Sequence, residues 1–275
     1  MSLLPFDWGG LDLVAVDNQY HKAILSLESG QLLKWEVKNS HKSKDILYHG
    51  SSISRTGIPI LFPFADSLEK GIYNHTNWPI QRHGFGRNLT WTLENLTEDE
   101  VTISLADKDL CDELKQAYPF KFKVYLMLDF SKPNIMTYSI KVENLGEKLM
   151  AIAPGIHPYI NLKNDQKSTV KIAGIKNFDA SKIDWESKMD GGMYYDFNKM
   201  ARVAFPDFTL DIQGKSPDIS NCFSQLVIWS QPSSMIDSDF ICVESFTRPI
   251  NGINDDPILI QSGETWKGVL EFKVS

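Results

Sequence analysis

The sequence predicts an all-β fold, a large antiparallel sandwich or barrel with one or two short helices. Short hydrophobic runs rich in β-branched and aromatic residues recur along the 275 residues, and turn-forming residues separate them. Helical patterns do not alternate with these runs, which disfavours a doubly wound sheet of parallel strands. The chain shows no internal repeat, low-complexity tract or linker, so we expect one domain, residues 1–275.

The first strand patterns lie close together at residues 13–16, 23–27 and 32–37. Such close spacing without helices between the strands implies antiparallel pairing. A segment rich in glycine and proline follows, from residue 39 to residue 87. Loop segments of this length within a compact domain are more often functional than passive, which makes this one a candidate part of a site.

Strand patterns dominate the rest of the chain. The clearest covers residues 122–130, in which apolar residues alternate with polar or longer ones, and residues 136–142 are its expected partner across a turn. Polar loops are expected at residues 161–166 and 212–220. Further strands are expected at residues 90–93, 101–105, 170–172, 203–205, 226–229, 240–244, 258–261 and 268–274.

The best helix candidate is the segment 107–118. Leu110, Leu114 and Ala117 fall on one helical face there, and Pro119 ends the run. Proline cannot continue a helix, because it lacks the amide N–H and its ring clashes with the preceding turn. We therefore expect a short helix between two strands.

The composition is that of a soluble globular protein with a mildly acidic surface. The 28 lysines and arginines are outnumbered by 35 aspartates and glutamates, which argues against a nucleic-acid partner and against a membrane partner, since both need a concentrated positive patch. Cys111, Cys222 and Cys242 are widely spaced, which fits neither a disulfide framework nor a zinc site and suggests a reducing compartment. The first residues lack a secretory pattern, and no run is long enough to span a membrane. We expect a cytoplasmic protein, either a monomer or a homodimer.

A single histidine lies in a stiff segment near the middle of the chain. His157 belongs to Ala153-Pro154-Gly155-Ile156-His157-Pro158-Tyr159-Ile160, where the two prolines favour extended or turn geometry. An unperturbed histidine titrates near neutral pH, so a rigidly aimed one suits proton transfer. The alternative is a partly buried structural histidine that donates to a carbonyl group at a strand end.

Glu244 lies on a strand pattern with apolar neighbours. Within residues 240–246, a period of two places it on one face with Phe240, Cys242 and Phe246. A carboxylate among apolar neighbours is costly to ionise, so its pKa is expected to rise toward the range of a general base. The alternative is an edge strand whose Glu244 points to water.

Two further segments contain groups that can bind a ligand. Arg82-His83-Gly84-Phe85-Gly86-Arg87 places two cations and a histidine at a glycine-rich turn, where they either converge on an anionic or hydroxylated ligand or lie in solvent. Residues 189–197 contain two glycines beside aspartates, which is ordinary turn chemistry.

Four stretches together resemble the aldose 1-epimerase (galactose mutarotase-like) superfamily. In the order of that family they are Gly57-Ile58-Pro59-Ile60-Leu61-Phe62-Pro63-Phe64, then His83-Gly84-Phe85-Gly86-Arg87-Asn88 with Trp91, then Gly155-Ile156-His157-Pro158-Tyr159, then Cys242-Val243-Glu244. These motifs span most of the chain. The resemblance implies a large mutarotase-like β-sandwich that interconverts the α and β anomers of a hexose.

By this resemblance, Glu244 is the general base on the anomeric hydroxyl, His157 is the general acid on the ring oxygen, and His83 holds the sugar. A family aspartate that binds ring hydroxyls would fall on Asp190, with Asp196 as the competing choice. Opening and reclosing a hemiacetal requires only proton transfers, so we expect neither a cofactor nor a metal.

The sequence also departs from the family pattern. Many aldose epimerases place an asparagine-arginine pair shortly after the Pro-x-x-Phe-Pro run, where this chain has Asp66-Ser67. The missing arginine removes a galactose-type substrate contact. Arg55 and Arg87 resemble instead the hexose-6-phosphate epimerase branch, whose arginines bind phosphate. A neutral hexose and a hexose 6-phosphate therefore stay alternative substrates.

Two other function classes stay open. A carbohydrate-binding or regulatory protein could keep the sandwich and the sugar cleft without turnover. A metal-dependent jelly roll could use His83, His157 and Glu244 as ligands, although the closely spaced histidine pair typical of such sites is missing. Phosphate-binding glycine loops, dinucleotide fingerprints, nucleophile elbows and helical His-Glu-x-x-His motifs are missing as well.

Overall fold

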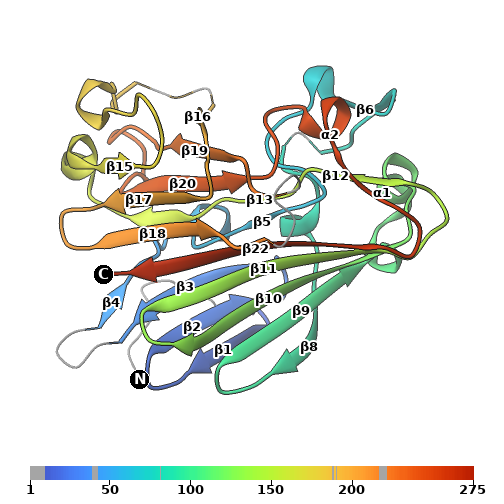
Figure 1. Cartoon of the computed structure of the whole chain (residues 1–275), viewed down its shortest axis with the longest axis horizontal. Helices are drawn as coiled ribbons and strands as arrows, with labels where there is room; N and C mark the ends of the chain where they lie inside the picture. Colours follow the sequence, from blue (N-terminus) through green and yellow to red (C-terminus); the bar gives the residue numbers. More distant parts are fainter. Residues whose placement is uncertain (1–9, 39–42, 81, 188, 190, 217–221) are drawn as a thin grey trace.

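Antiparallel β-sheets make up nearly all the regular structure of the protein (Figure 1). The structure is a computed structural model that describes residues 10–38, 43–80, 82–187, 189, 191–216 and 222–275. Its short α-helices are α1 (Asp112–Ala117) and α2 (Gly252–Asp255). The predicted all-β class with short helices is confirmed. Within the described ranges, no helix combines the length and the apolar character needed to cross a membrane.

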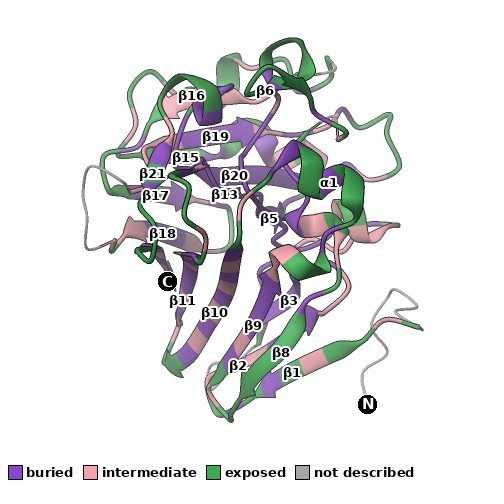
Figure 2. Ribbon diagram, turned by 90° about the vertical axis from the view of Figure 1, so that its right-hand side faces the viewer, coloured by how far each residue is buried: buried purple, intermediate pink, exposed green. Residues whose placement is uncertain are grey.

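The largest sheet has eight strands and contains the clearest of the predicted strands. Its order is β15 (Lys171–Ala173), β17 (Met200–Ala204), β18 (Thr209–Gly214), β22 (Thr265–Val274), β11 (Ile135–Asn144), β10 (Phe122–Lys132), β9 (Glu100–Ala106) and β8 (Thr92–Leu96). The predicted pairing of residues 122–130 with residues 136–142 is confirmed, since Val124 pairs with Val142 and Leu128 with Tyr138. Figure 2 shows the resulting alternation along β10, whose residues are buried and half-buried in turn.

A second sheet carries the residues singled out for chemistry. Its order is β16 (Met193–Asp196), β19 (Gln225–Trp229), β20 (Phe240–Phe246), β13 (Gly155–Ile156) and β5 (Ile60–Leu61), and β14 (Tyr159–Asn161) also pairs with β20. All residues of β20 are buried. Because β20 has partners on both sides, the alternative of an edge strand with Glu244 in water is wrong.

The remaining strands form small sheets. β1 (Leu13–Asp17), β2 (His21–Ser26), β3 (Gln31–Val37) and β4 (Lys44–Asp45) follow one another in a four-stranded sheet. The two-stranded sheets join β12 (Met150–Ile152) to β21 (Ile258–Ile260) and β6 (Ile72–Tyr73) to β7 (Thr76–Asn77). The glycine-rich and proline-rich segment between β4 and β8 thus contains little regular structure, as expected.

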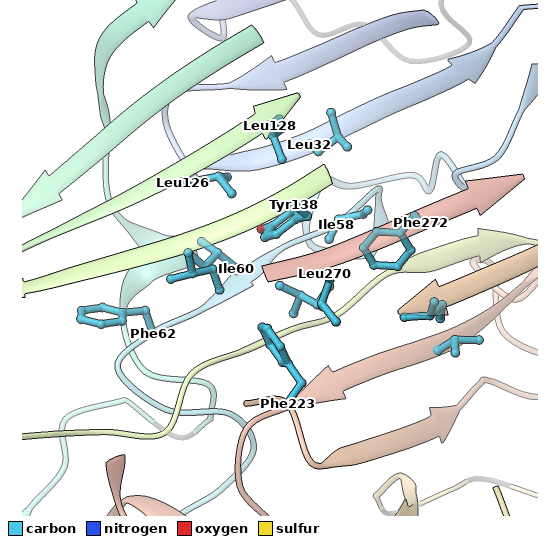
Figure 3. Close-up of a cluster of buried hydrophobic side chains, with 14 of the residues drawn as sticks. Leu32, Ile58, Ile60, Phe62, Leu126, Leu128, Tyr138, Phe223, Leu270 and Phe272 are labelled. Carbon is cyan, nitrogen blue, oxygen red and sulfur yellow. The ribbon is translucent and has the colours of Figure 1, made fainter. Parts of the chain in front are cut away.

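The sheets enclose a shared hydrophobic core (Figure 3). Leu32 of β3 and Phe62 after β5 lie there with Leu126, Tyr138 and Leu270 of the eight-stranded sheet. These side chains come from sequence segments far apart, so the core closes only when the sheets come together. Burial of such apolar area is the main favourable term in folding.

Three local predictions need correction. The helix expected over residues 107–118 covers only Asp112–Ala117, because Leu110 and Cys111 adopt extended backbone angles and the buried Leu110 side chain joins the core. Residues 212–214, expected in a polar loop, belong to β18, where they pair with β22. Residues 161–166 contain the end of β14 and the start of a short 3-10 helix, Asn164–Thr169.

Candidate active site

One cavity of about 560 Å³ brings together residues from several of the predicted motifs. Its lining includes Arg55, His83, Arg87, His157 and Glu244. They come from the 3-10 helix Ile53–Arg55, from the 3-10 helix Gly86–Asn88 and the turn before it, from the segments around β13 and β14, and from β20. The turn that carries His83 and Arg87 therefore faces a cavity, whereas the side chain of Arg82 in the same turn is 48% exposed.

His157 and Glu244 form a buried pair in the wall of this cavity. His157 lies between β13 and β14, where its backbone N–H donates to Pro59 O at 3.1 Å. The distance from His157 Nε2 to Glu244 Oε1 is 3.4 Å, and the side chains are 7% and 4% exposed. Pairing of Tyr159 with Cys242 sets this geometry, because it aligns the two segments. His157 therefore contacts a carboxylate across the sheet.

Burial controls the protonation of this pair. It raises the pKa of the Glu244 carboxyl well above its ordinary value, and the nearby charge of Asp66 raises it further. It lowers the pKa of the His157 imidazole well below its ordinary value, and the charge of Arg87 lowers it further. Both shifts favour the uncharged forms, a carboxylic acid at Glu244 and a neutral imidazole at His157.

His83 is held as a neutral hydrogen-bond donor. The backbone N–H of Asp66 donates to His83 Nδ1 at 2.9 Å, and the backbone N–H of His83 donates to Asp66 O at 2.8 Å. Because Nδ1 accepts, the proton of the neutral ring lies on Nε2. Burial lowers the pKa of His83 well below its ordinary value, with a further contribution from Arg87, which keeps the ring neutral. Its ring lies 5.5 Å from that of His157, centroid to centroid.

Tyr159, Trp229 and Arg55 also line the cavity. The ring of Tyr159 stacks on His157 at 4.7 Å between centroids, and the indole of Trp229 lies 5.9 Å from His157. The guanidinium of Arg55 lies 5.2 Å from the centre of the Trp229 ring and donates to the Tyr159 hydroxyl at 3.3 Å. Burial and stacking thus fix the imidazole of His157 from one side.

Of the two predicted substrate-binding aspartates, the structure describes only Asp196. Asp190 lies outside the described residues, although Gly191 and Gly192 line the cavity. Asp196 lines a separate cavity of about 720 Å³ beside residues 174–177. As Asp196 is absent from the lining of the cavity that holds Glu244, the competing choice of Asp196 is not supported.

Asp66 and Trp229 line the cavity, although the sequence assigned them no role. Arg82, one of the two cations of the predicted ligand-binding turn, lines it as well. Asp66 attracted attention only as a departure from a family pattern, and Trp229 only as the end of a strand. The signal that could have found Asp66 is its place two residues after the motif that ends in Phe64.

A thiol lies beside the acid–base pair. One ligand atom each from His157, Cys242 and Glu244 lies within 4.8 Å of the others, a donor set that zinc accepts. The metal-dependent alternative expected His83 in place of Cys242. Burial raises the pKa of the Cys242 thiol well above its ordinary value, and three arginines line the cavity, so both the thiol and the local charge oppose a bound cation.

Comparison with known proteins agrees with the fold and the motifs. The family model for aldose 1-epimerase matches residues 12–200. An Escherichia coli (strain K12) protein provisionally named glucose-6-phosphate 1-epimerase is 27% identical over 175 residues, which cover 62% of this chain and 55% of that protein. The match thus spans about half the length of that relative.

Two solved structures share the fold. The Slr1438 protein from Synechocystis sp. PCC 6803 superposes with a TM-score of 0.77 at 21% identity, covering 96% of both chains. A galactose mutarotase related enzyme from Lactobacillus acidophilus gives a TM-score of 0.74 at 16% identity, covering 96% of this chain and 97% of the other. These matches establish a galactose mutarotase-like β-sandwich, and with the family model over most of its length the chain belongs to the aldose 1-epimerase family.

Proposed function

We propose that the protein interconverts the α and β anomers of a hexose, with Glu244 as general base and His157 as general acid. The supporting observation is the 3.4 Å distance between His157 Nε2 and Glu244 Oε1 in the cavity wall. The hydroxyl oxygen and the ring oxygen of a hemiacetal are bonded to the same carbon. A base for one and an acid for the other must therefore be close neighbours, as these groups are.

In the proposed ring opening, the sugar loses one proton at O1 and gains one proton at O5. Glu244 removes the proton from O1, His157 delivers a proton to O5, and the C1–O5 bond breaks to give the open-chain aldehyde. Rotation about C1–C2 presents the other face of the carbonyl group. O5 then adds to C1, His157 takes back its proton, and O1 recovers a proton from Glu244.

The protonation of the pair changes during this cycle. Ring opening starts from a Glu244 carboxylate and a His157 imidazolium and ends with a carboxylic acid and a neutral imidazole. Ring closure runs between the same two forms in reverse. Burial favours the uncharged forms of both groups, which are the forms present at the open-chain stage. The Nε2–H of His83 supplies a fixed donor to a sugar oxygen.

A hexose 6-phosphate is the second candidate substrate. Arg55 and Arg87 both line the cavity, and arginine recognises phosphate through a rigid fork of N–H donors. The name of the Escherichia coli relative agrees with this candidate. The comparison of glucose with glucose 6-phosphate decides between the two substrates, because a phosphate site predicts a lower KM for the phosphorylated sugar.

Anomer exchange measured by NMR or polarimetry tests the proposal. Glucose, galactose and glucose 6-phosphate are each compared with a buffer control, and we expect at least one to equilibrate faster with protein. Glu244→Gln keeps the size of the side chain, and we expect it to lower kcat by about 10²–10⁴-fold. Full activity of this variant would show that Glu244 is not the base. Saturable sugar binding without exchange would favour the non-catalytic alternative.

A further inference from the structure

A second cavity adjoins the candidate active site and takes no part in the proposed reaction. Its volume is about 720 Å³, against about 560 Å³ for the candidate active-site cavity. The turn 174–177 after β15 forms one part of its lining, and β16, Asn198 and Gln225 of β19 form another. Tyr194 of β16 also lines it, and the Tyr194 hydroxyl donates to Asp66 Oδ2 in the other cavity. Tyr194 therefore joins the walls of the two cavities.

The second cavity lies at a free strand edge. Within the described residues β16 is the outermost strand of its sheet and pairs only with β19. The backbone N–H of Phe197 donates to Ser224 O in continuation of this pairing. Backbone groups alternate in direction along an antiparallel strand, so those of Tyr195 also face β19 and those of Tyr194 and Asp196 face the free edge. Because Tyr194 and Asp196 line the cavity, their backbone donors and acceptors are available to a ligand.

Amide side chains add further hydrogen-bonding groups to the lining. Asn177, Asn198 and Gln225 make no side-chain hydrogen bond to any described residue, and an amide group both donates and accepts. Lys176 and Asp196 contribute one charge of each sign. The lining thus offers many donors and acceptors without a net charge.

Tyr195 contributes a half-buried aromatic ring with an under-used hydroxyl. The ring of Phe178 packs edge-on against it at 5.8 Å between centroids, which fixes its orientation. The Tyr195 hydroxyl donates to Met193 Sδ at 3.9 Å, and a thioether sulfur is a weak acceptor. A ligand oxygen would therefore be a better acceptor for this hydroxyl.

This set of groups fits an uncharged sugar. Sugar hydroxyls donate and accept, as amides and backbone groups do, and the apolar C–H groups of a sugar ring can pack on an aromatic ring. An apolar ligand would cover the amides and leave them without partners, which is costly. An extended peptide could use the strand edge, but it needs an open edge, whereas here the turn 174–177 forms another wall of the cavity.

We propose that this cavity is a second carbohydrate site, which binds one uncharged monosaccharide or disaccharide beside the candidate active site. The amides of Asn177, Asn198 and Gln225 exchange hydrogen bonds with the sugar hydroxyls, and the Tyr195 hydroxyl donates to a sugar oxygen. Binding here requires no turnover, so the inference does not rest on the proposed function.

Methionine methyl NMR tests the inference on the full chain. Met193 is a suitable reporter, because its sulfur contacts the Tyr195 hydroxyl and it does not line the candidate active-site cavity. Glucose, maltose and glucose 6-phosphate are titrated into protein with isotope-labelled methionine methyl groups. We expect a saturable shift of the Met193 signal with glucose or maltose. Glucose 6-phosphate should bind this site no more tightly than glucose, because the lining has no net charge.

A double variant separates the two cavities. Asn198→Ala combined with Gln225→Ala removes two amides and should weaken the sugar dependence of the Met193 shift by about 10-fold or more. Anomer exchange and thermal unfolding should stay at wild-type values, because neither amide has a hydrogen-bond partner among the described residues. Gln116→Ala is the matched control. It removes an exposed amide from α1, outside the lining of both cavities, and should keep the shift.

Three results would overturn the inference. A Met193 shift of equal affinity in wild type and in the double variant would come from sugar in the candidate active-site cavity. Lack of a saturable shift with all three sugars would exclude the site. A shift with the tripeptide trialanine alone would assign the strand edge to a peptide. The proposed function fails separately, through lack of anomer exchange in wild type, and the titration then still decides on the second site.

Discussion

Burial shifts the pKa values of Glu244 and His157 more than any single neighbour does. Desolvation is the largest cause of both pKa shifts, and it acts in opposite directions on an acid and on a base. The charge of Arg87 then acts on both groups, lowering the pKa of each. If the proposed reaction takes place, a change at Arg87 should therefore move its pH range.

Replacing Arg87 with glutamine is expected to move both limbs of the pH profile to higher pH. The productive pair carries one proton, so activity falls in acid when a second proton binds and in alkali when the last one leaves. Without the positive charge of Arg87, both the imidazole and the carboxyl bind protons more tightly, and both pKa values rise. The measurement is kcat/KM for unphosphorylated glucose across pH, which avoids any phosphate contact. Limbs that stay in place would show that Arg87 does not act on the pair.

At the scale of elements, several side chains of the candidate site are positioned by turns and short segments and not by the long strands. His83 and Gly84 both have positive φ, at 66° and 63°, which turns the chain sharply before Arg87. Gly84 also pairs with Phe62 through a backbone bridge, so the His83 turn is fixed against the segment after β5. A Cβ atom at Gly84 would lie 2.1 Å from the carbonyl oxygen of Phe62. Only glycine fits this close contact.

Gly84→Ala is expected to destabilise the protein much more than Gly71→Ala. Gly71 has a similar φ of 68°, but a Cβ atom there meets nothing within 4 Å. Gly71→Ala should therefore cost only the left-handed backbone conformation, about 1–2 kcal/mol. Gly84→Ala adds a backbone clash and should also displace His83. Thermal unfolding and the KM for sugar measure the two effects, and equal losses in the two variants would contradict this account.

At the scale of the whole molecule, buried polar contacts join the separate sheets. His21 of β2 has 0% exposure, and its Nε2 lies 2.8 Å from the carbonyl oxygen of Lys132 at the end of β10. Trp35 Nε1 donates to His21 Nδ1 at 3.2 Å, so the neutral ring carries its proton on Nε2 and donates to Lys132. Burial lowers the pKa of His21 below its ordinary value. A second proton would break the contact with Trp35.

Acid is expected to weaken the fold partly through His21. Because its pKa is lower in the folded than in the unfolded chain, its contribution to stability is complete above the ordinary pKa of about 6.5 and declines as pH falls toward the folded value. His21→Gln should be less stable at pH 8 but lose less stability toward pH 5, with at most about 1.4 kcal/mol per pH unit at stake. Urea unfolding at several pH values measures this slope. His75→Gln, at an exposed position, is the control and should keep the wild-type slope.

The sequence by itself determined the fold class and named many of the residues of the candidate site. Alternation of apolar residues reports which side of a strand is buried, so the strands of the eight-stranded sheet and the inward face of Glu244 could be predicted. The family motifs named His83, Arg55 and Arg87, and all three line one cavity. The local apolar pattern gave a wrong prediction at Leu110, which was expected in the helix over residues 107–118. Its side chain is buried in the core and its backbone is extended, so the helix begins after it.

Only the tertiary structure decided how the groups meet. Pairing of Tyr159 with Cys242 brings His157 beside Glu244, and the bridge between Ser67 and Arg82 brings a guanidinium to Asp66. These contacts join segments distant in the chain, and no local period encodes the register between them. The pKa shifts follow from the same closure, because they arise from burial that exists only once the sheets have come together.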